Sequence, residues 1–394
     1  MCSGRYWSRS VLVVLISIVA LAGPACSDAP EDNSANYNNA NNANINSNNA
    51  NTNSNNETNN ETNNETNNET NNETNNETNN ETNNQTNDVD ITDTVHVAYV
   101  EELCEVGPDG FEWCYEADSL DHELWKQAVV VVEGGSSYVG GDGIEPGSSI
   151  TEVDSGAVCR VDDSGDEEWC VEFADGVDDL AVDSNEDIYV PIGASVSDFD
   201  DSALCRFDDQ GDEQWCADLD FRPRAVAVTP DGNDVYVGGY LDTICRFDDQ
   251  GEQQWCNSDY RGSPQAMTLT DAGELFVGFG GGFSDAEVCR VDEQGDESGC
   301  FELHGGGMTS LKSDTDGDLY TGLTDEEDNP CKLADDGELI WCNSGERTVE
   351  SVAPVANGTL FSAEEAAVVQ YDENGDKIGQ VQRLGPMDIA VAPE

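Results

Sequence analysis

Cysteine is the residue whose spacing carries the most chemical information in this chain. Twelve of its 14 cysteines form six close pairs, with nine residues between the partners of the first pair and ten in the others. No Cys-x-x-Cys motif occurs and there are only three histidines, which argues against zinc sites. Paired cysteines in a chain that begins like an exported protein instead predict disulfides. The expected bridges are Cys104–Cys114, Cys159–Cys170, Cys205–Cys216, Cys245–Cys256, Cys289–Cys300 and Cys331–Cys342.

The residues between paired cysteines predict a β-hairpin. In CRFDDQGDEQWC (205–216), two short strands flank an acidic four-residue turn that contains Gly211, a residue that turn chemistry favours. This hairpin places Cys205 opposite Cys216, where the Cα atoms of facing residues lie about 4.5 Å apart, within disulfide range. Each bridge is therefore expected to stay within its own hairpin.

Cys26 has no partner once the other twelve are paired and Cys2 has left with a signal peptide. It follows the apolar run VLVVLISIVALAG (11–23), which is too short to span a bilayer and suits a signal core. The stretch LAGPAC resembles a bacterial lipoprotein cleavage site, although Gly23 and Pro24 depart from that pattern. We expect lipidation of Cys26, with ordinary signal cleavage after Ala25 as the alternative.

Tryptophan and basic residues recur beside these cysteines. Hairpin parity places Trp169 opposite Arg160, with the same Trp–cation relation in three other hairpins (Trp215/Arg206, Trp255/Arg246 and Trp341/Lys332). The pairs could form cation–π contacts and a carbohydrate-binding stack, or could pack one repeat on the next. The acidic turns DDSGD, DDQGD and DEQGD lack the spacing of an EF-hand loop, so no cofactor is expected beyond weak Ca²⁺ binding.

The hairpins belong to a repeat whose period predicts a propeller. Hairpin starts are separated by 55, 46, 40, 44, 42 and 38 residues, counting a seventh copy without cysteines at 369–380. A second hairpin-like unit precedes each one, as in AVAVTPDGNDVYVGG (225–239), so a repeat reads as four strands, A to D. The first copy lacks strand A, and MDIAVAPE (387–394) supplies one. We predict an all-β, seven-bladed propeller closed by joining both ends, with a parallel β-solenoid as the alternative.

The D-G-x-x-Y-V and D-x-x-G-x-x-x-W patterns resemble the bacterial β-propeller repeats called SBBP and, more loosely, the blades of quinoprotein dehydrogenases. The resemblance covers about residues 97–394 and implies architecture more than activity. Quinone enzymes of this type would normally have eight blades and dedicated metal ligands, for which no matching residues occur here.

Three zones divide the chain: a signal peptide (1–25), a lipidated Cys with an Asn-rich tether of NNET repeats (26–88), and the propeller (89–394). Eleven of the 83 acidic and two of the 15 basic residues precede residue 89, so the propeller carries a net charge of about −59. This charge argues against nucleic acid as a partner and suits salty surroundings. Membrane contact is expected only through the lipid anchor.

No nucleophile elbow, phosphate loop or His-centred acid–base set is present. We expect no catalytic residues and a non-enzymatic binding or scaffold module, monomeric, with an unidentified protein or glycan ligand. It would sit in the bacterial cell envelope, anchored to the outer membrane and facing the surface or the periplasm. The alternatives are a quinone-dependent oxidoreductase, a glycan-acting enzyme and a purely structural surface protein. Any site should lie among the long B–C and D–A loops, at 140–158, 193–204 and 279–288.

Overall fold

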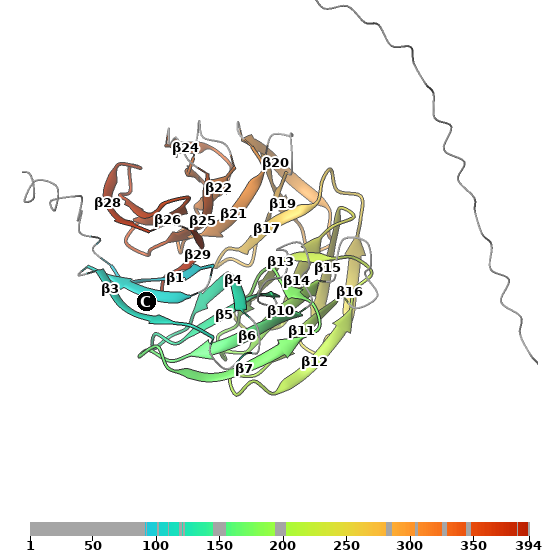
Figure 1. Ribbon diagram of the computed structural model, residues 1–394. Helices are drawn as coiled ribbons and strands as arrows, with labels where there is room; N and C mark the ends of the chain where they lie inside the picture. Colours follow the sequence, from blue (N-terminus) through green and yellow to red (C-terminus); the bar gives the residue numbers. More distant parts are fainter. Residues whose placement is uncertain are drawn as a thin grey trace, which may run out of the picture. The chain divides into compact units, whose positions relative to one another are not determined.

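A computed structural model describes residues 91–392, apart from gaps at 92, 101, 109, 118–119, 121–122, 145–154, 194–201, 281–285, 304–305, 325–328, 344–347 and 384. The predicted signal peptide, Cys26 and the tether lie outside the described residues. Within them the chain is all-β, and its strands form seven antiparallel sheets arranged as the blades of a propeller (Figure 1). The predicted fold class is therefore confirmed.

Blades I to VII follow the order of the chain, and their strands run from the channel outward. Blade I contains β29 (Pro386–Ala390), β1 (Val95–Tyr99), β2 (Leu103–Gly107) and β3 (Gly110–Tyr115). Blade II contains β4 (Glu123–Val131), β5 (Ser137–Ile144), β6 (Ser155–Val161) and β7 (Glu167–Phe173). Blade III contains β8 (Gly176–Val177), β9 (Ala181–Val182), β10 (Ile188–Gly193), β11 (Ala203–Phe207) and β12 (Glu213–Asp218). Blade IV contains β13 (Pro223–Val228), β14 (Asp234–Gly239), β15 (Thr243–Asp248) and β16 (Gln253–Asn257).

The last three blades keep the same four-stranded plan. Blade V contains β17 (Pro264–Leu269), β18 (Leu275–Phe279), β19 (Ala286–Val291) and β20 (Glu297–Leu303). Blade VI contains β21 (Met308–Ser313), β22 (Leu319–Leu323), β23 (Cys331–Leu333) and β24 (Leu339–Cys342). Blade VII contains β25 (Val349–Pro354), β26 (Leu360–Glu364), β27 (Ala367–Tyr371) and β28 (Lys377–Gln382).

The ring closes through blade I as the half-repeats predict. Strand β29, from the C-terminal end of the domain, pairs antiparallel with β1, and Ile389 lies opposite Val97 (Figure 1). The strand is shorter than expected because it ends at Ala390. Closure leaves the blade with four strands, and no open inner edge remains at β1.

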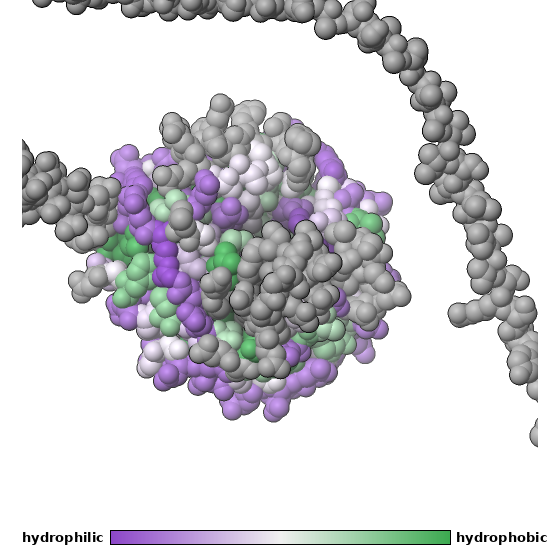
Figure 2. Space-filling model, viewed as in Figure 1, coloured by the Kyte–Doolittle hydropathy of each residue, from purple (hydrophilic) through white to green (hydrophobic). Residues whose placement is uncertain are grey.

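Seven apolar clusters hold the described part of the ring together, one at each contact between neighbouring blades. The cluster between blades VII and I contains Ile389 together with Val95 and Phe361, all nearly or fully buried. The core is thus a ring of seams and has no single centre. Hydrophilic side chains cover much of the rim in the view of Figure 2.

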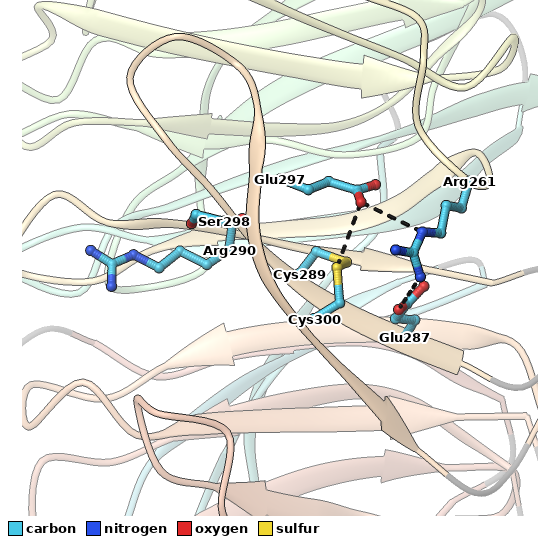
Figure 3. Close-up of a disulfide and its surroundings, with 7 residues drawn as sticks. All are labelled: Arg261, Glu287, Cys289, Arg290, Glu297, Ser298 and Cys300. Atoms are coloured by element: carbon cyan, nitrogen blue, oxygen red, sulfur yellow. Dashed lines mark hydrogen bonds and ion pairs between the residues drawn. A yellow bond between two sulfur atoms is a disulfide. The ribbon is translucent and has the colours of Figure 1, made fainter.

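All six predicted disulfides lie within hairpins. The register pairs Cys205 with Cys216, and the Cα–Cα distance of this bridge is 4.1 Å. The other five are equivalent, with Cα–Cα distances of 4.0–4.1 Å. Figure 3 shows Cys289–Cys300, which joins β19 to β20 beside the pairs that Arg261 makes with Glu287 and Glu297.

Candidate binding site in the central channel

Tryptophan joins the blades of the ring. Trp215 of blade III lies against Gly251 in the C–D turn of blade IV, so closely that a Cβ at this glycine would meet the indole at 2.7 Å. The indole Nε1 of Trp215 also donates to the backbone oxygen of Asp249 at 3.1 Å. Equivalent contacts are Trp113 on Gly165, Trp169 on Gly211, Trp255 on Gly295 and Trp341 on Gly375. Of the two roles that the sequence left open, the structure supports packing between blades.

The cation–π partner predicted for the basic residues was wrong. Arg206 does face Trp215 across the strand pair, as parity required. Its guanidinium carbon, however, lies over the ring of Tyr189, 5.6 Å from the centroid, and the equivalent cations of the described blades likewise lie over tyrosine (Arg160 on Tyr138, Arg246 on Tyr236, Lys332 on Tyr320). The tyrosine lies opposite the cation on strand B, the neighbouring strand on the channel side, and the indole is turned toward the next blade.

The acidic turns use their carboxylates internally. Asp208 Oδ1 accepts the backbone N–H groups of Gln210 and Asp212 at 3.0 and 2.9 Å. The same pattern recurs at Asp162, Asp248, Asp292 and Asp372. These oxygens organise the turns. Three Glu–Cys–Cys groups also gather, but their sulfurs belong to disulfides.

A ring of seven side chains converges on the channel, one from the inner strand of each blade. In six blades this residue is the extra residue of a β-bulge, which the paired strand skips; in blade III it lies between β8 and β9. A bulge turns a side chain out of the regular alternation. The seven residues are Met387, Gln127, Asp178, Arg224, Gln265, Thr309 and Glu350, from blades I to VII in that order. We call them the channel ring.

The channel ring lines a cavity of about 100 Å³. Most ring residues stand near the start of strand A, so the cavity lies at the end of the channel nearest the B–C and D–A loops. We expected any site on that face. Part of the predicted 140–158 loop is strand, because β5 extends to Ile144 and β6 begins at Ser155. Most of each remaining loop lies outside the described residues.

Two carboxylates just behind the ring connect successive blades. Asp388 accepts the backbone N–H of Val129, in the next blade, at 2.8 Å and the hydroxyl of Ser351. Asp179 accepts the N–H of Val226, also in the next blade, at 2.9 Å. Burial raises the pKa of Asp179 to about 6, and the charge of Lys312 opposes the shift. Burial likewise raises the pKa of Asp388, again against Lys312.

Asp179 also explains a deviation in blade III. Its Oδ1 accepts the N–H of the adjacent Leu180 at 2.9 Å, which takes the place of a strand-ladder contact. The inner strand, predicted as one element, is therefore divided into β8 and β9, both paired with β10. Asp178 stands in this break and enters the channel ring.

A polar network lies beside the ring at blades II to IV. The guanidinium of Arg222 spans both oxygens of Asp178 at 3.1 and 3.2 Å. Gln127 Nε2 donates to Oδ2 of the buried Asp142 at 2.6 Å. Burial, aided by the negative charge of Asp178 and opposed by Arg222, raises the pKa of Asp142 to about 6. The charged state of this network therefore changes at mildly acidic pH.

A second hollow of about 330 Å³ lies at the other end of the channel, near the A–B turns. Its wall is more apolar and includes Val130, Leu269 and Ala353, and Lys312 borders both hollows. The cavity at the channel ring is the one into which every blade sends a side chain.

Comparison with known proteins gives no assignment, because no family model and no curated protein matches the chain. No helix in the described part is long and apolar enough to cross a bilayer. The sequence had not singled out the channel ring as a site. Its signal would have been a polar residue at the same place in most of the apolar inner strands, as in PRAVAV and PQAMTL, although blade I has Met387 there.

Proposed function

We propose that the protein is a non-enzymatic binding module outside the cytoplasm, and that a small ligand occupies the cavity at the channel ring. The observation that carries this proposal is the convergence of seven bulged or strand-break residues, one per blade, on one cavity. Bulges cost regular pairing and recur beside functional sites. A scaffold role alone would not need polar and charged residues at these positions.

Six disulfides indicate an oxidising compartment, either extracellular or periplasmic. We propose that lipidated Cys26 anchors the chain to the outer membrane of a bacterial envelope and that the Asn-rich segment acts as a tether. Mass spectrometry of the native N-terminal peptide should find acylated Cys26, and Cys26→Ala should release the protein to the soluble fraction. An unmodified N-terminus at another residue would refute the anchor. A kinship with SBBP-type repeats is likewise a proposal, supported only by the repeat pattern.

The binding role can be tested by thermal shift with defined panels of amino acids, sugars, polyamines and nucleotides. We expect one class to raise the melting temperature of wild-type protein and to lose this effect in Arg224→Gln. Arg261→Gln is the matched control, because Arg261 is an exposed arginine away from the channel. If no class shifts melting, or if both variants respond alike, the channel is not the binding site.

A glycan-acting enzyme is the second candidate, favoured by the paired carboxylates Asp142 and Asp178. Burial raises the pKa of both, to about 6 for Asp142, which suits a general acid. Hydrolysis of chromogenic glycosides that is lost in Asp142→Asn would support catalysis. Absence of turnover across the panel would leave the binding role alone.

A further inference from the structure

Charges of opposite sign are sorted to opposite sides of the cavity. The arc of blades IV to VI contributes Arg224 and Lys312, with the neutral Gln265 between them. The arc from blade VII round to blade III contributes four carboxylates, Glu350, Asp388, Asp178 and Asp179. The cavity thus has a cationic wall facing an anionic wall, which neither a simple cation site nor a simple anion site requires.

Some of these charges are already neutralised by the protein. Asp178 is held by Arg222, and Asp179 and Asp388 accept N–H groups from the next blade. Among the described residues, Arg224 donates a hydrogen bond only to the neutral amide oxygen of Gln265, and its guanidinium lies over the ring of Tyr240, 4.8 Å from the centroid. Its charge also acts on Asp178, but Arg222 is the cation that pairs with that carboxylate. The charge of Arg224 therefore remains available to a ligand.

Glu350 is the other available charge, whereas the charge of Lys312 already acts on Asp179 and Asp388. Glu350 makes no ion pair with any residue in the part of the chain that the structure describes. Burial, followed by the nearby charge of Glu365, raises the pKa of Glu350. A ligand ammonium at Glu350 and a ligand carboxylate at Arg224 would supply the missing partners.

The size of the cavity favours a small ligand. Its volume of about 100 Å³ has room for several water molecules. This suits a molecule of few heavy atoms with its two charges close together. The wall is mainly polar, so a large apolar side chain is not accommodated within it.

We propose that the channel ring binds a small zwitterionic α-amino acid of the size of glycine or alanine, with its carboxylate toward Arg224 and its ammonium toward Glu350. The inference rests on the proposed binding function and gives it a ligand class. Two fixed walls of opposite charge reward a ligand that carries both charges and penalise one that carries a single charge.

Calorimetric titration of the oxidised full-length protein with alanine, propionate and ethylamine tests this directly. Propionate lacks the ammonium of alanine and ethylamine lacks its carboxylate, while both are similar in size. We expect alanine to bind at least ten-fold more tightly than either. Arg224→Gln and Glu350→Gln should each weaken alanine binding at least ten-fold, whereas Arg261→Gln should leave it unchanged. The comparison of the three ligands needs only wild-type protein, so it remains decisive if a variant folds poorly.

The outcomes separate this inference from the binding function itself. If ethylamine or propionate binds as tightly as alanine, the site takes single ions and the zwitterion proposal fails. If alanine does not bind, but a sugar or polyamine does and is lost in Arg224→Gln, the ligand class is wrong and the binding function stands. If no compound binds in a manner that Arg224→Gln changes, both proposals fail.

Discussion

Ring closure through β29 can be tested with one buried side chain. Ile389 is only 1% exposed and packs in the cluster that joins blades VII and I. Truncation of a buried isoleucine to alanine costs about 2–5 kcal/mol, because apolar contact is lost and a cavity remains. At about 2–4 °C per kcal/mol for a domain of this size, Ile389→Ala should lower the melting temperature by about 5–15 °C.

The chain offers a matched control in Ile378, on the outer strand β28, which is 37% exposed. Ile378→Ala should cost less than about 0.5 kcal/mol, as surface substitutions generally do. Circular dichroism melting of the oxidised proteins compares the two. Deletion of residues 386–394 should be at least as damaging as Ile389→Ala, because it also unpairs β1 and removes the acceptor of the Val129 N–H. If Ile389→Ala and Ile378→Ala have the same melting temperature, β29 does not close the ring.

Three further predictions concern seams, pH and salt. Gly251→Ala should destabilise the domain by about 1–3 kcal/mol more than Gly273→Ala, as measured by chemical unfolding. Both glycines have positive φ, but only a Cβ at Gly251 meets Trp215. Equal losses of stability would show that the indole contact is unimportant. Burial raises the pKa of Asp142 and Asp179 to about 6, above the value of about 3.9 in the unfolded chain. The folded state therefore binds more protons than the unfolded state between about pH 4 and 6. The contribution of these two groups to stability consequently falls as pH rises through this window. Buried His96, whose pKa is lowered to about 4, acts in the opposite direction, so the test is a difference between variants. From pH 7 to 5 the melting temperature of the wild type should gain relative to that of Asp142→Asn; parallel curves would refute the assignment. Melting temperature should also climb from 0.1 to 2 M NaCl as ions screen the acidic excess, and a flat curve would mean local compensation.

The fold could be predicted from the sequence because its signals are local and repeated. Each hairpin carries its own turn glycine and, in six copies, a cysteine pair that fixes the register, so Cys205 opposite Cys216 followed from spacing alone. Closure followed from two complementary half-repeats. Neither prediction requires knowing how the blades pack against one another.

The candidate site could not be predicted in the same way, because it depends on small departures from regular pairing. A bulge at Arg224 or Glu350 moves one side chain into the channel without changing the apolar pattern around it. The cation–π partner was missed for a related reason. Strand parity predicts on which face of the sheet Arg206 lies, but not whether its guanidinium contacts Tyr189 or Trp215. Which charges remain available likewise depends on contacts between blades.

The Trp–Gly contact between neighbouring blades affects how such a ring can gain or lose repeats. Blades I to IV and VI carry an indole on the outer strand that packs on a turn glycine of the next blade, and in blade V Phe301 takes this place against Gly337. A blade such as III, with Gly211 in its turn and Trp215 on its outer strand, therefore brings one half of the contact on each side. Blade VII illustrates the independence of this pair, because Gly375 receives Trp341 although the blade has no cysteines. A duplicated or deleted repeat of this kind would find a matching neighbour at both junctions. The main change would be in the circumference of the channel and in its set of seven side chains. Ligand choice could therefore diverge by gain or loss of whole repeats while the seams stay intact.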